Sequence, residues 1–385
     1  MSEHNTNVPK IRFPGFTDAW EKREFGDMAI RNSTMAECTS VLPSVEYEDI
    51  VSGQGILDKD IREKEIIKVG IRFEPGDVLF GKLRPYLKNW ILPDFPGVAV
   101  GDFWVLRPSE TDSNYLYYLI QTPAFQTAAN QSTGTKMPRS DWNLVSKTSF
   151  FAPRDKAEQS KIGQTLQALD RLITLHQRKL NHLQDEKKGL LQKMFPKGGE
   201  NFPELRFPGF TGAWEQRKAV SIFQTVSDKN HPELPVLSAS QELGMIRRDQ
   251  IGIDIKYDEK STKTYKRVTP GQFVIHLRSF QGGFAHSNVE GITSPAYTVL
   301  DFKDKSRHDD KFWREVFTSS IFIKHLETVT YGIRDGRSIS FTDFSTLKFY
   351  FPSFEEQKKI GEFFNQLDHL ITLHQRKLEH LQDRK

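Results

Sequence analysis

The segment KIGQTLQALDRLITLHQRKLNHLQD, residues 161–185, occurs a second time as KIGEFFNQLDHLITLHQRKLEHLQD, residues 359–383. The two copies align without a gap, and 18 of their 25 positions are identical. Chance does not produce such agreement, so the chain contains an internal repeat. A second pair of similar segments, RFPGFTDAW at 12–20 and RFPGFTGAW at 206–214, lies upstream of the two copies. The chain is therefore a duplicated unit: a lead-in segment, a globular stretch and a long helix.

Apolar residues in both copies recur at alternating spacings of four and three. This period of 3.5 residues is typical of a coiled-coil seam. We expect the two helices to pair with each other, because two unrelated cores would not require the same surface residues on both. The predicted seam consists of Ile162, Leu166, Leu169, Ile173, His176, Leu180 and Leu183 in the first helix and Ile360, Phe364, Leu367, Ile371, His374, Leu378 and Leu381 in the second.

Both helices also carry start signals. Pro153 is followed by Asp155 and Glu158, and Pro352 is followed by Ser353 and Glu356. This spacing predicts a capping box at the start of each helix. The sequence Phe195-Pro196, followed by two glycines, predicts the end of the first helix.

Composition limits the class of protein. Of 385 residues, 37% are hydrophobic, which is enough for globular cores and argues against disorder. The polar N-terminus has no signal core, and no apolar run is long enough to cross a bilayer. The single cysteine, Cys38, cannot form an intramolecular disulfide and fits a reducing compartment. We therefore expect a cytoplasmic protein without a membrane partner.

The stretches around the helices have short β-rich runs, turns with Pro and Gly, and helical segments, which indicates mixed α/β domains. We predict a first globular domain at 1–153, a helix with a linker at 154–200, a second globular domain at 201–352 and a final helix at 353–385. The predicted fold class is α+β. A net charge of +4 is too small for a protein that binds nucleic acid through phosphate contacts alone, so any nucleic-acid contact must come from local clusters of basic residues.

Two pairs of loops carry such clusters. Residues 76–88 and 271–283 each begin as an apolar strand and continue into a loop with arginine and an aromatic ring, and residues 134–139 and 332–337 are basic in both halves. Arginine and lysine on loops suit contacts to phosphate and guanine, and glutamine suits adenine. The alternative is ordinary surface charge beside turns. The candidate DNA-binding residues are Lys82, Arg84, Tyr86, Lys88, Lys136, Arg139, Arg278, Ser279, Gln281, Arg334 and Arg337.

Motifs for catalysis and cofactors fail on inspection. The sequence GDVLFGKL at 76–83 has the spacing of a phosphate-binding loop, but Leu83 stands where Ser or Thr must bind magnesium. His176 and His182 are six residues apart on a helix, too far around it to bind one metal. We find no nuclease cluster and no Asn-Pro-Pro-aromatic methyltransferase motif. The sequence predicts no catalytic, cofactor-binding or metal-binding residue in this chain.

Taken together, the chain resembles the specificity (S) subunit of type I restriction–modification systems. The resemblance covers nearly the whole chain and lies in the FPGFT segments, LFGKLRPYL at 79–87, GDFWVLRP at 101–108, residues 132–139, LRSFQGG at 277–283, SPAYTVL at 294–300 and the helix starts Glu158-Gln159 and Glu356-Gln357. It implies two target-recognition domains separated by two long conserved helices that form an antiparallel coiled coil, in a chain with pseudo-two-fold duplication.

The resemblance also implies partners. Each recognition domain would read one half of a bipartite, asymmetric target in double-stranded DNA. Two methyltransferase subunits, which bind S-adenosylmethionine, and restriction subunits would dock on this non-catalytic chain. Two other classes stay open at this point. A stand-alone nuclease or methyltransferase would bind its own cofactor when purified, and a coiled-coil scaffold would not bind DNA even with its partners present.

Overall fold

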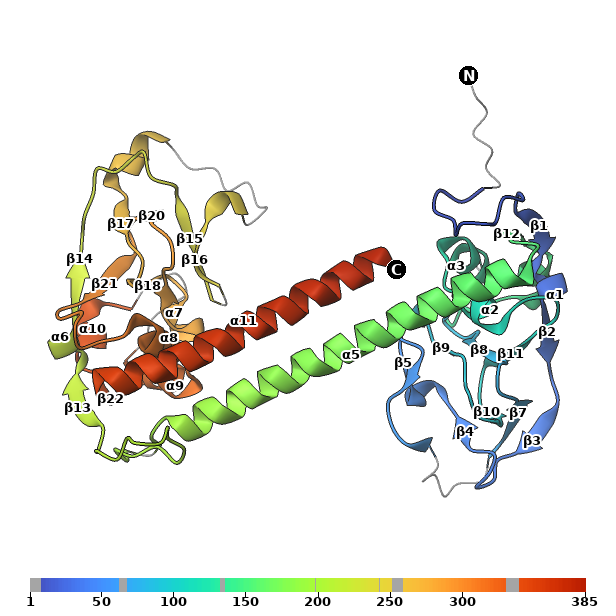
Figure 1. Cartoon of the computed structure of the whole chain (residues 1–385), viewed down its shortest axis with the longest axis horizontal. Coiled ribbons are helices and arrows are strands. Elements are labelled where there is room, and N and C mark those ends of the chain that lie inside the picture. Colours follow the sequence, from blue (N-terminus) through green and yellow to red (C-terminus); the bar gives the residue numbers. More distant parts are fainter. Residues whose placement is uncertain are drawn as a thin grey trace. The chain divides into compact units, whose positions relative to one another are not determined.

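The computed structural model describes residues 8–61, 68–131, 136–197, 199–241, 243–250, 259–329 and 339–385. The chain divides into two compact units (Figure 1). Unit 1 contains residues 1–174 and 381–385, and unit 2 contains residues 175–380. Both combine helices and strands, in agreement with the predicted α+β class. None of the helices in the described ranges is long and apolar enough to span a membrane.

Unit 1 contains two four-stranded sheets and two strand pairs. One sheet has the order β2-β11-β8-β9 and the other β3-β7-β10-β4, while β1 pairs with β12 and β5 with β6. The strands are β1 (Glu21–Glu24), β2 (Ala29–Asn32), β3 (Met35–Glu37), β4 (Ser44–Val45), β5 (Ile50–Val51), β6 (Ile56–Leu57), β7 (Val69–Phe73), β8 (Val78–Gly81), β9 (Trp90–Ile91), β10 (Gly97–Ala99), β11 (Phe103–Pro108) and β12 (Ser149–Ala152).

Short helices pack against the first of these sheets. They are α1 (Phe25–Met28), α2 (Ser113–Leu119), α3 (Pro123–Ala129) and α4 (Trp142–Lys147), with 3-10 turns η1 (Tyr47–Asp49) and η3 (Pro85–Leu87). Pro123 ends the helical run that the sequence predicts at 115–127 and starts a second helix. Phe25, Phe80, Trp104 and Phe125 lie at the centre of the resulting aromatic core.

Unit 2 repeats the main sheet. The order β14-β21-β18-β19 corresponds to β2-β11-β8-β9, and β13 pairs with β22 as β1 pairs with β12. The strands are β13 (Glu215–Lys218), β14 (Phe223–Val226), β15 (Leu237–Ser240), β16 (Gly244–Arg247), β17 (Lys266–Val268), β18 (Phe273–Ile275), β19 (Ala285–His286), β20 (Gly291–Thr293), β21 (Thr298–Phe302) and β22 (Lys348–Phe351). The duplication seen in the helices therefore extends to the sheets.

The helices of unit 2 cover a core of Phe223, Phe273, Trp313, Phe317 and Phe344. They are α6 (Ala219–Ile222), α7 (Ser279–Gly282), α8 (Asp310–Thr318), α9 (Ser320–Val329) and α10 (Phe341–Ser345), with 3-10 turns η4 (Arg248–Gln250) and η5 (Glu259–Thr264). One continuous helix is predicted at about 311–327. The structure instead breaks it at Ser319, whose extended backbone ends α8 and whose hydroxyl bonds to the carbonyl of Val316 and the amide of Phe322.

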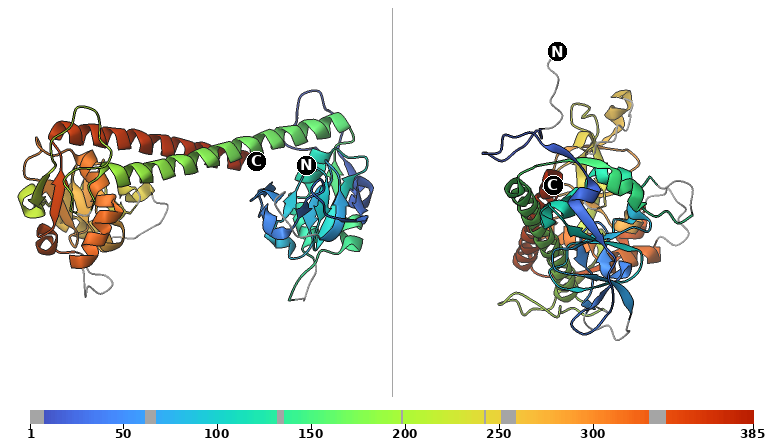
Figure 2. Two further views of the ribbon diagram at one scale, coloured as in Figure 1. Left: turned by 90° about the horizontal axis from the view of Figure 1, so that it is seen from below. Right: turned by 90° about the vertical axis from the view of Figure 1, so that its right-hand side faces the viewer.

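The two copies of the repeat form α5 (Lys156–Met194) and α11 (Phe354–Arg384). Within unit 2 the helices run antiparallel, because His176 contacts His374 while Lys187, further along α5, contacts Asp368, which is earlier in α11. Both views in Figure 2 show these parts of the helices alongside each other. The antiparallel pairing and the position of the histidines agree with the prediction.

The predicted seam is only partly a contact between helices. At the start of α5, Ile162 and Leu166 pack on the core of unit 1. At the start of α11, Ile360, Phe364 and Leu367 are part of the core of unit 2. The same apolar stripe therefore packs on the core of a unit at the start of each helix and on the other long helix further along.

The start of each long helix is anchored to its own unit by matching contacts. Both oxygens of Glu158 accept the guanidinium of Arg12, at 2.7 and 2.8 Å, so this glutamate joins helix and lead-in segment instead of closing the predicted capping box. Arg206 and Glu356 repeat the pair at 2.7 Å. The buried Gln159 and Gln357 also correspond, since each donates to the carbonyl of the preceding proline, Pro153 or Pro352.

A third matched contact involves glycine. Gly163 in α5 lies against the first residues of α2, and an added Cβ would be 2.6 Å from the Cβ of Asn114. Gly361 in α11 lies against α8 in the same way, with an added Cβ 2.7 Å from the amide nitrogen of Phe312. Only a residue without a side chain allows this approach, so the shared KIG sequence has a packing reason.

Candidate DNA interface

In unit 1 the structure brings the two predicted loops together. The segment after β8 and the segment before α4 form a bridge between Leu83 and Arg139. The amide of Arg84 donates to the carbonyl of Pro138 at 2.7 Å, and the amide of Ser140 donates to the carbonyl of Lys82 at 2.9 Å. The basic residues of both loops therefore belong to one surface.

Asp102, just before β11, orients two of these cations. Its Oδ2 accepts the guanidinium of Arg139 at 2.9 Å, and its Oδ1 lies 3.6 Å from the Nζ of Lys82. Burial raises the pKa of Asp102, but the bonds and charges of Arg139 and Lys82 outweigh this effect and hold the pKa below its ordinary value. The carboxylate stays ionised and fixes both cations, while the Arg139 side chain remains 53% exposed.

Tyr47 joins two backbone segments of the same site. Its hydroxyl donates to the carbonyl of Asp102 and accepts the amide of Leu83. Burial raises the pKa of Tyr47 to about 12, so the hydroxyl keeps its proton. Sequence analysis does not single out Tyr47 or Asp102. The sequence around Asp102, GDFWVLRP, does appear among the motifs of the family resemblance, but without a role for the carboxylate.

The tip of the first loop has an unusual backbone. Arg84 and Lys88 flank η3 with φ of 48° and 56°, in the left-handed region. A residue with a Cβ costs about 1–2 kcal/mol in this region. The amide of Leu87 donates to the carbonyl of Arg84, and the amide of Gly53 donates to the carbonyl of Lys88, so the surrounding chain holds the turn. Lys88 and Lys136 are exposed on the two loops.

In unit 2 the corresponding segment leaves β18 and forms α7. Arg278 and Gln281 are exposed, as the prediction requires. Ser279 is fully buried, and its hydroxyl accepts the amide of His276 at 2.7 Å. Because Ser279 serves to close the turn, we remove it from the candidate DNA contacts. Arg334 and Arg337 lie outside the described residues.

His276 lies beneath this turn. Its Nδ1 accepts the amide of Arg278 at 3.3 Å, and burial lowers the pKa of the imidazole. A neutral ring with Nδ1 as acceptor therefore supports the backbone of Arg278. This histidine is absent from the sequence-based site, because a single histidine next to an apolar strand gives no spacing signal.

Comparison with known proteins relates these surfaces to one family. Residues 215–383, which contain the second candidate interface and α11, match the model of the type I restriction modification DNA specificity domain. This part of the chain, residues 215–383, belongs to that domain family. Residues before 215 carry the same lead-in segment, sheet order and helix repeat. The family description assigns to this domain the DNA specificity of type I restriction modification.

A solved structure of a type I specificity subunit shares the fold. The S subunit of the type I system from M. genitalium aligns over 97% of this chain and 96% of its own, with a TM-score of 0.61 and 13% identity. The HsdS subunit from Thermoanaerobacter tengcongensis aligns over 98% and 96%, with a TM-score of 0.43 and 17% identity. No curated protein matches the sequence.

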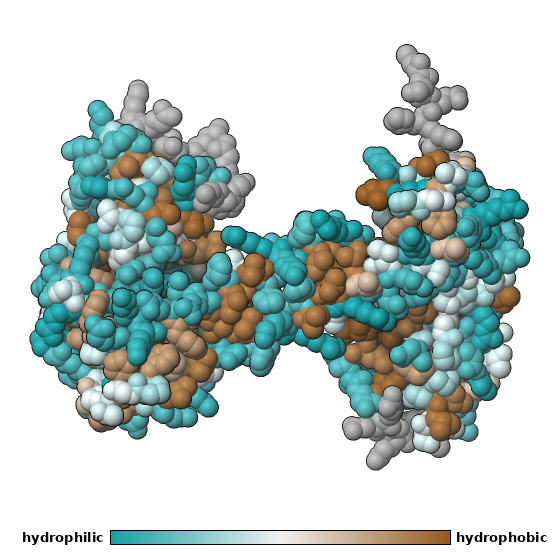
Figure 3. All heavy atoms as spheres, viewed as in Figure 1, coloured by the Kyte–Doolittle hydropathy of each residue, from teal (hydrophilic) through white to brown (hydrophobic). Residues whose placement is uncertain are grey.

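The long helices carry a second repeated surface. Leu172 and Leu175 lie on one face of α5, and Leu370 and Leu373 hold the same positions in α11. All four are exposed, and Leu175 and Leu373 are the most exposed of them at 61% and 54%. Apolar residues also gather over the long helices in the view of Figure 3. Large apolar side chains at matching exposed positions indicate a surface for protein contact.

Proposed function

We propose that the chain recognises a bipartite, asymmetric DNA target, with unit 1 reading one half-site and unit 2 the other. The observation that carries this proposal is that equivalent sheets end in different loops. Unit 1 presents Lys82, after β8, and Arg139, on the bridged loop, around Asp102. After β18, unit 2 presents Arg278 and Gln281. Different polar groups on equivalent scaffolds suit two different half-sites.

Arg139 is the strongest candidate for a base contact in unit 1. A guanidinium that one carboxylate already orients loses less freedom on binding, and arginine donates two parallel bonds to guanine. Lys88 and Lys136 suit phosphates, since a lysine ammonium acts as a point charge. In unit 2, Gln281 suits adenine and Arg278 suits guanine or phosphate.

The test is methylation mapping in cells that express the chain with its methyltransferase partner. Arg139→Ala should relax one half-site, and Gln281→Ala should relax the other. A lost base contact costs about 1–3 kcal/mol at one position, whereas a lost phosphate contact weakens all sequences alike. Arg72→Ala and Arg247→Ala are matched controls, because these exposed arginines pair with Glu74 and Asp249 outside the loops. If Arg139→Ala and Gln281→Ala relax the same bases, the two-reader proposal is wrong.

We further propose that the helices dock two methyltransferase subunits, which bind S-adenosylmethionine, and that restriction subunits join this assembly. Two copies of one exposed leucine pair suit two copies of one partner. The chain itself then has no catalytic role. Purified chain incubated with labelled S-adenosylmethionine and duplex DNA should neither transfer methyl groups nor cleave the DNA. Methyl transfer by this chain free of partners would overturn the proposal.

A further inference from the structure

The tip of the first loop in unit 1 presents two adjacent apolar side chains to solvent. Tyr86 is 55% exposed and Leu87 is 42% exposed, although Pro85 beside them is buried. Met137, on the neighbouring loop, is also exposed. Single exposed apolar residues are common on proteins and need no explanation. Two in succession at the tip of a turn, with a third on the adjoining loop, form a small apolar projection.

This projection is rigid. Left-handed residues, Arg84 and Lys88, stand on both sides of it, and their conformations are fixed by backbone bonds to Pro138 and Gly53. The hydroxyl of Ser52 donates to the carbonyl of Leu87 as a further tie. A fixed turn holds Tyr86 and Leu87 outward, so these side chains cannot fold back onto the core. Strained backbone of this kind is kept where a side chain must be presented in one direction.

Cations lie on both of the bridged loops that carry the projection. Lys82 and Lys88 lie on its own loop, and Lys136 and Arg139 lie on the loop bridged to it. Two of these cations, Arg139 and Lys82, pair with the carboxylate of Asp102. An apolar tip inside a ring of positive charge suits a ligand with an anionic outside and stacked apolar faces inside. Duplex DNA has this chemistry, because its phosphates enclose the base stack.

We propose that Tyr86 and Leu87 form a wedge that enters duplex DNA at one base step of the half-site read by unit 1 and partly unstacks it. The ring of Tyr86 stacks on an exposed base face, and Leu87 fills the space that opens beside it. The surrounding cations bind the phosphates on both sides. This inference rests on the proposed function, and it adds that unit 1 selects sequences whose steps open easily.

Unit 2 offers an internal contrast. At the corresponding place its turn presents the polar side chains of Arg278 and Gln281 beside a single exposed apolar residue, Leu277, and its backbone is not left-handed at Arg278, where φ is −111°. The two half-sites are therefore expected to differ in how they are read, with deformation of the DNA confined to the half-site of unit 1.

The test uses the full chain assembled with its methyltransferase partner, and duplexes that carry the target found by methylation mapping. The fluorescent base 2-aminopurine replaces each adenine, or an adenine introduced at a tolerated position, along both half-sites. Apart from the adenines that the methyltransferase itself flips out of the stack, fluorescence should rise several-fold at one step of the unit 1 half-site and at none in the other. The double variant Tyr86→Ser/Leu87→Ser should abolish the rise, whereas Tyr86→Phe should keep it. Val41→Ser, at an exposed apolar residue elsewhere in unit 1, is the control and should keep it as well.

A second measurement removes the dependence on a fluorescent base. A mismatch at the wedge step lowers the cost of unstacking. The mismatch should therefore raise the affinity of the wild-type assembly for the duplex about tenfold more than it raises the affinity of the Tyr86→Ser/Leu87→Ser variant.

Unchanged fluorescence along the unit 1 half-site, with normal binding and methylation, would overturn the wedge and leave the two-reader proposal intact. Loss of methyltransferase assembly in the double variant, with fluorescence unchanged when bound, would show that the tip is a protein contact and would also overturn it. Variants in both units that relax the same bases would instead refute the two-reader proposal.

Discussion

The Nδ1 atoms of His176 and His374 lie 3.0 Å apart, and the two residues hold the same position in the two copies of the repeat. A hydrogen bond between two Nδ1 atoms requires one ring to donate and the other to accept, so one ring must be neutral at Nδ1. Burial, together with the charges of Lys377 and His374, lowers the pKa of His176. The centre of the helix pair is therefore sensitive to acid.

Unit 2 should lose stability as the pH falls below about 6.5, the pKa of histidine in an unfolded chain. The unfolded state takes up a proton first there, because the pKa of His176 is lower in the folded state. Thermal unfolding from pH 7.5 to 5.0 should show a midpoint that falls less in His176→Asn/His374→Asn than in the wild type. Burial also lowers the pKa of His308 to about 4, but this contribution is present in both proteins and cancels. His182→Asn, at an exposed position of α5, is the control. Equal pH dependence in all three proteins would contradict the prediction.

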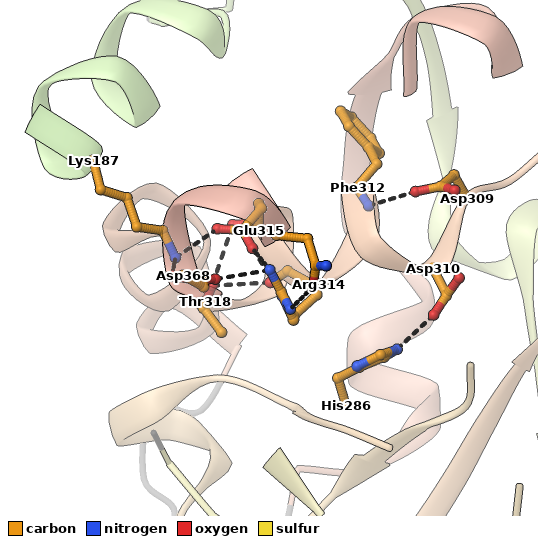
Figure 4. A network of polar contacts seen from close by, with 10 residues as sticks. Lys187, His286, Asp309, Asp310, Phe312, Arg314, Glu315, Thr318 and Asp368 are labelled. Atoms are coloured by element: carbon orange, nitrogen blue, oxygen red, sulfur yellow. Dashed lines mark hydrogen bonds and ion pairs between the residues drawn. The ribbon is translucent and has the colours of Figure 1, made fainter. Parts of the chain in front are cut away.

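Lys187 joins α5 to the charged groups of α8 and α11 (Figure 4). Its Nζ lies 2.6 Å from Asp368 and 3.2 Å from the buried Glu315. Lys187→Met removes one of the two cations that balance Glu315, and Arg314 remains as the other. We expect a loss of about 1–3 kcal/mol in the free energy of unfolding, measured in urea, with faster hydrogen exchange in α8. Lys188→Met, one residue along on the exposed side of α5, should change stability by less than about 0.5 kcal/mol. Similar losses in both variants would mean that the network adds no stability.

Two glycines of α5 should respond oppositely to the same substitution. At Gly163 an added methyl group meets Asn114 and the amide of Tyr115 at 2.6 and 2.8 Å, so Gly163→Ala should destabilise the protein by about 1–3 kcal/mol. At Gly189 nothing lies within 4 Å, so Gly189→Ala should stabilise it by about 0.5–1 kcal/mol through helix propensity alone. Urea unfolding of both variants tests this. Stabilisation by Gly163→Ala would show that the contact with α2 is loose.

The exposed leucines should matter for assembly and not for folding. Leu175→Glu/Leu373→Glu places charges on both copies of the proposed docking surface, so co-purification of the methyltransferase partner should fall at least tenfold while the unfolding midpoint stays within a few degrees. Leu243→Glu, at another exposed leucine, should leave assembly unchanged. Normal assembly of the double variant would place the docking surface elsewhere.

The helices could be predicted from sequence because their signals are local. A period of 3.5 residues and a proline before the first turn indicate both helices and where they begin, and Pro196 with the following glycines indicates where α5 ends. What the first turns pack against is not a local property. Ile162 and Ile360 belong to the same 3.5-residue repeat of apolar positions as Leu180 and Leu378. Only the tertiary fold places the two isoleucines against the cores of their own units.

The candidate site remains a prediction, but the structure shows how far a sequence pattern can describe it. The strand followed by a loop at 271–283 includes Gln281, and the basic loop at 134–139 includes Arg139; both side chains are exposed. The pattern could not separate Ser279 from its neighbours, because one buried hydroxyl bond decides its role. It also did not assign a role to Asp102, which acts through two residues that are 20 and 37 positions away in the sequence.

The matched anchors at the starts of α5 and α11 have an evolutionary consequence. The same ion pair, Arg12 with Glu158 and Arg206 with Glu356, joins each long helix to its lead-in segment, although the two globular stretches differ. A second matched bond runs from Gln159 and Gln357 to the carbonyl of the preceding proline. None of these anchors lies in the loops proposed to read DNA. A gene segment that encodes a different stretch between the lead-in tryptophan and the helix would inherit the fastening without further change. If the loops read DNA as proposed, one such replacement would change the target sequence in a single step and leave the shared helices untouched.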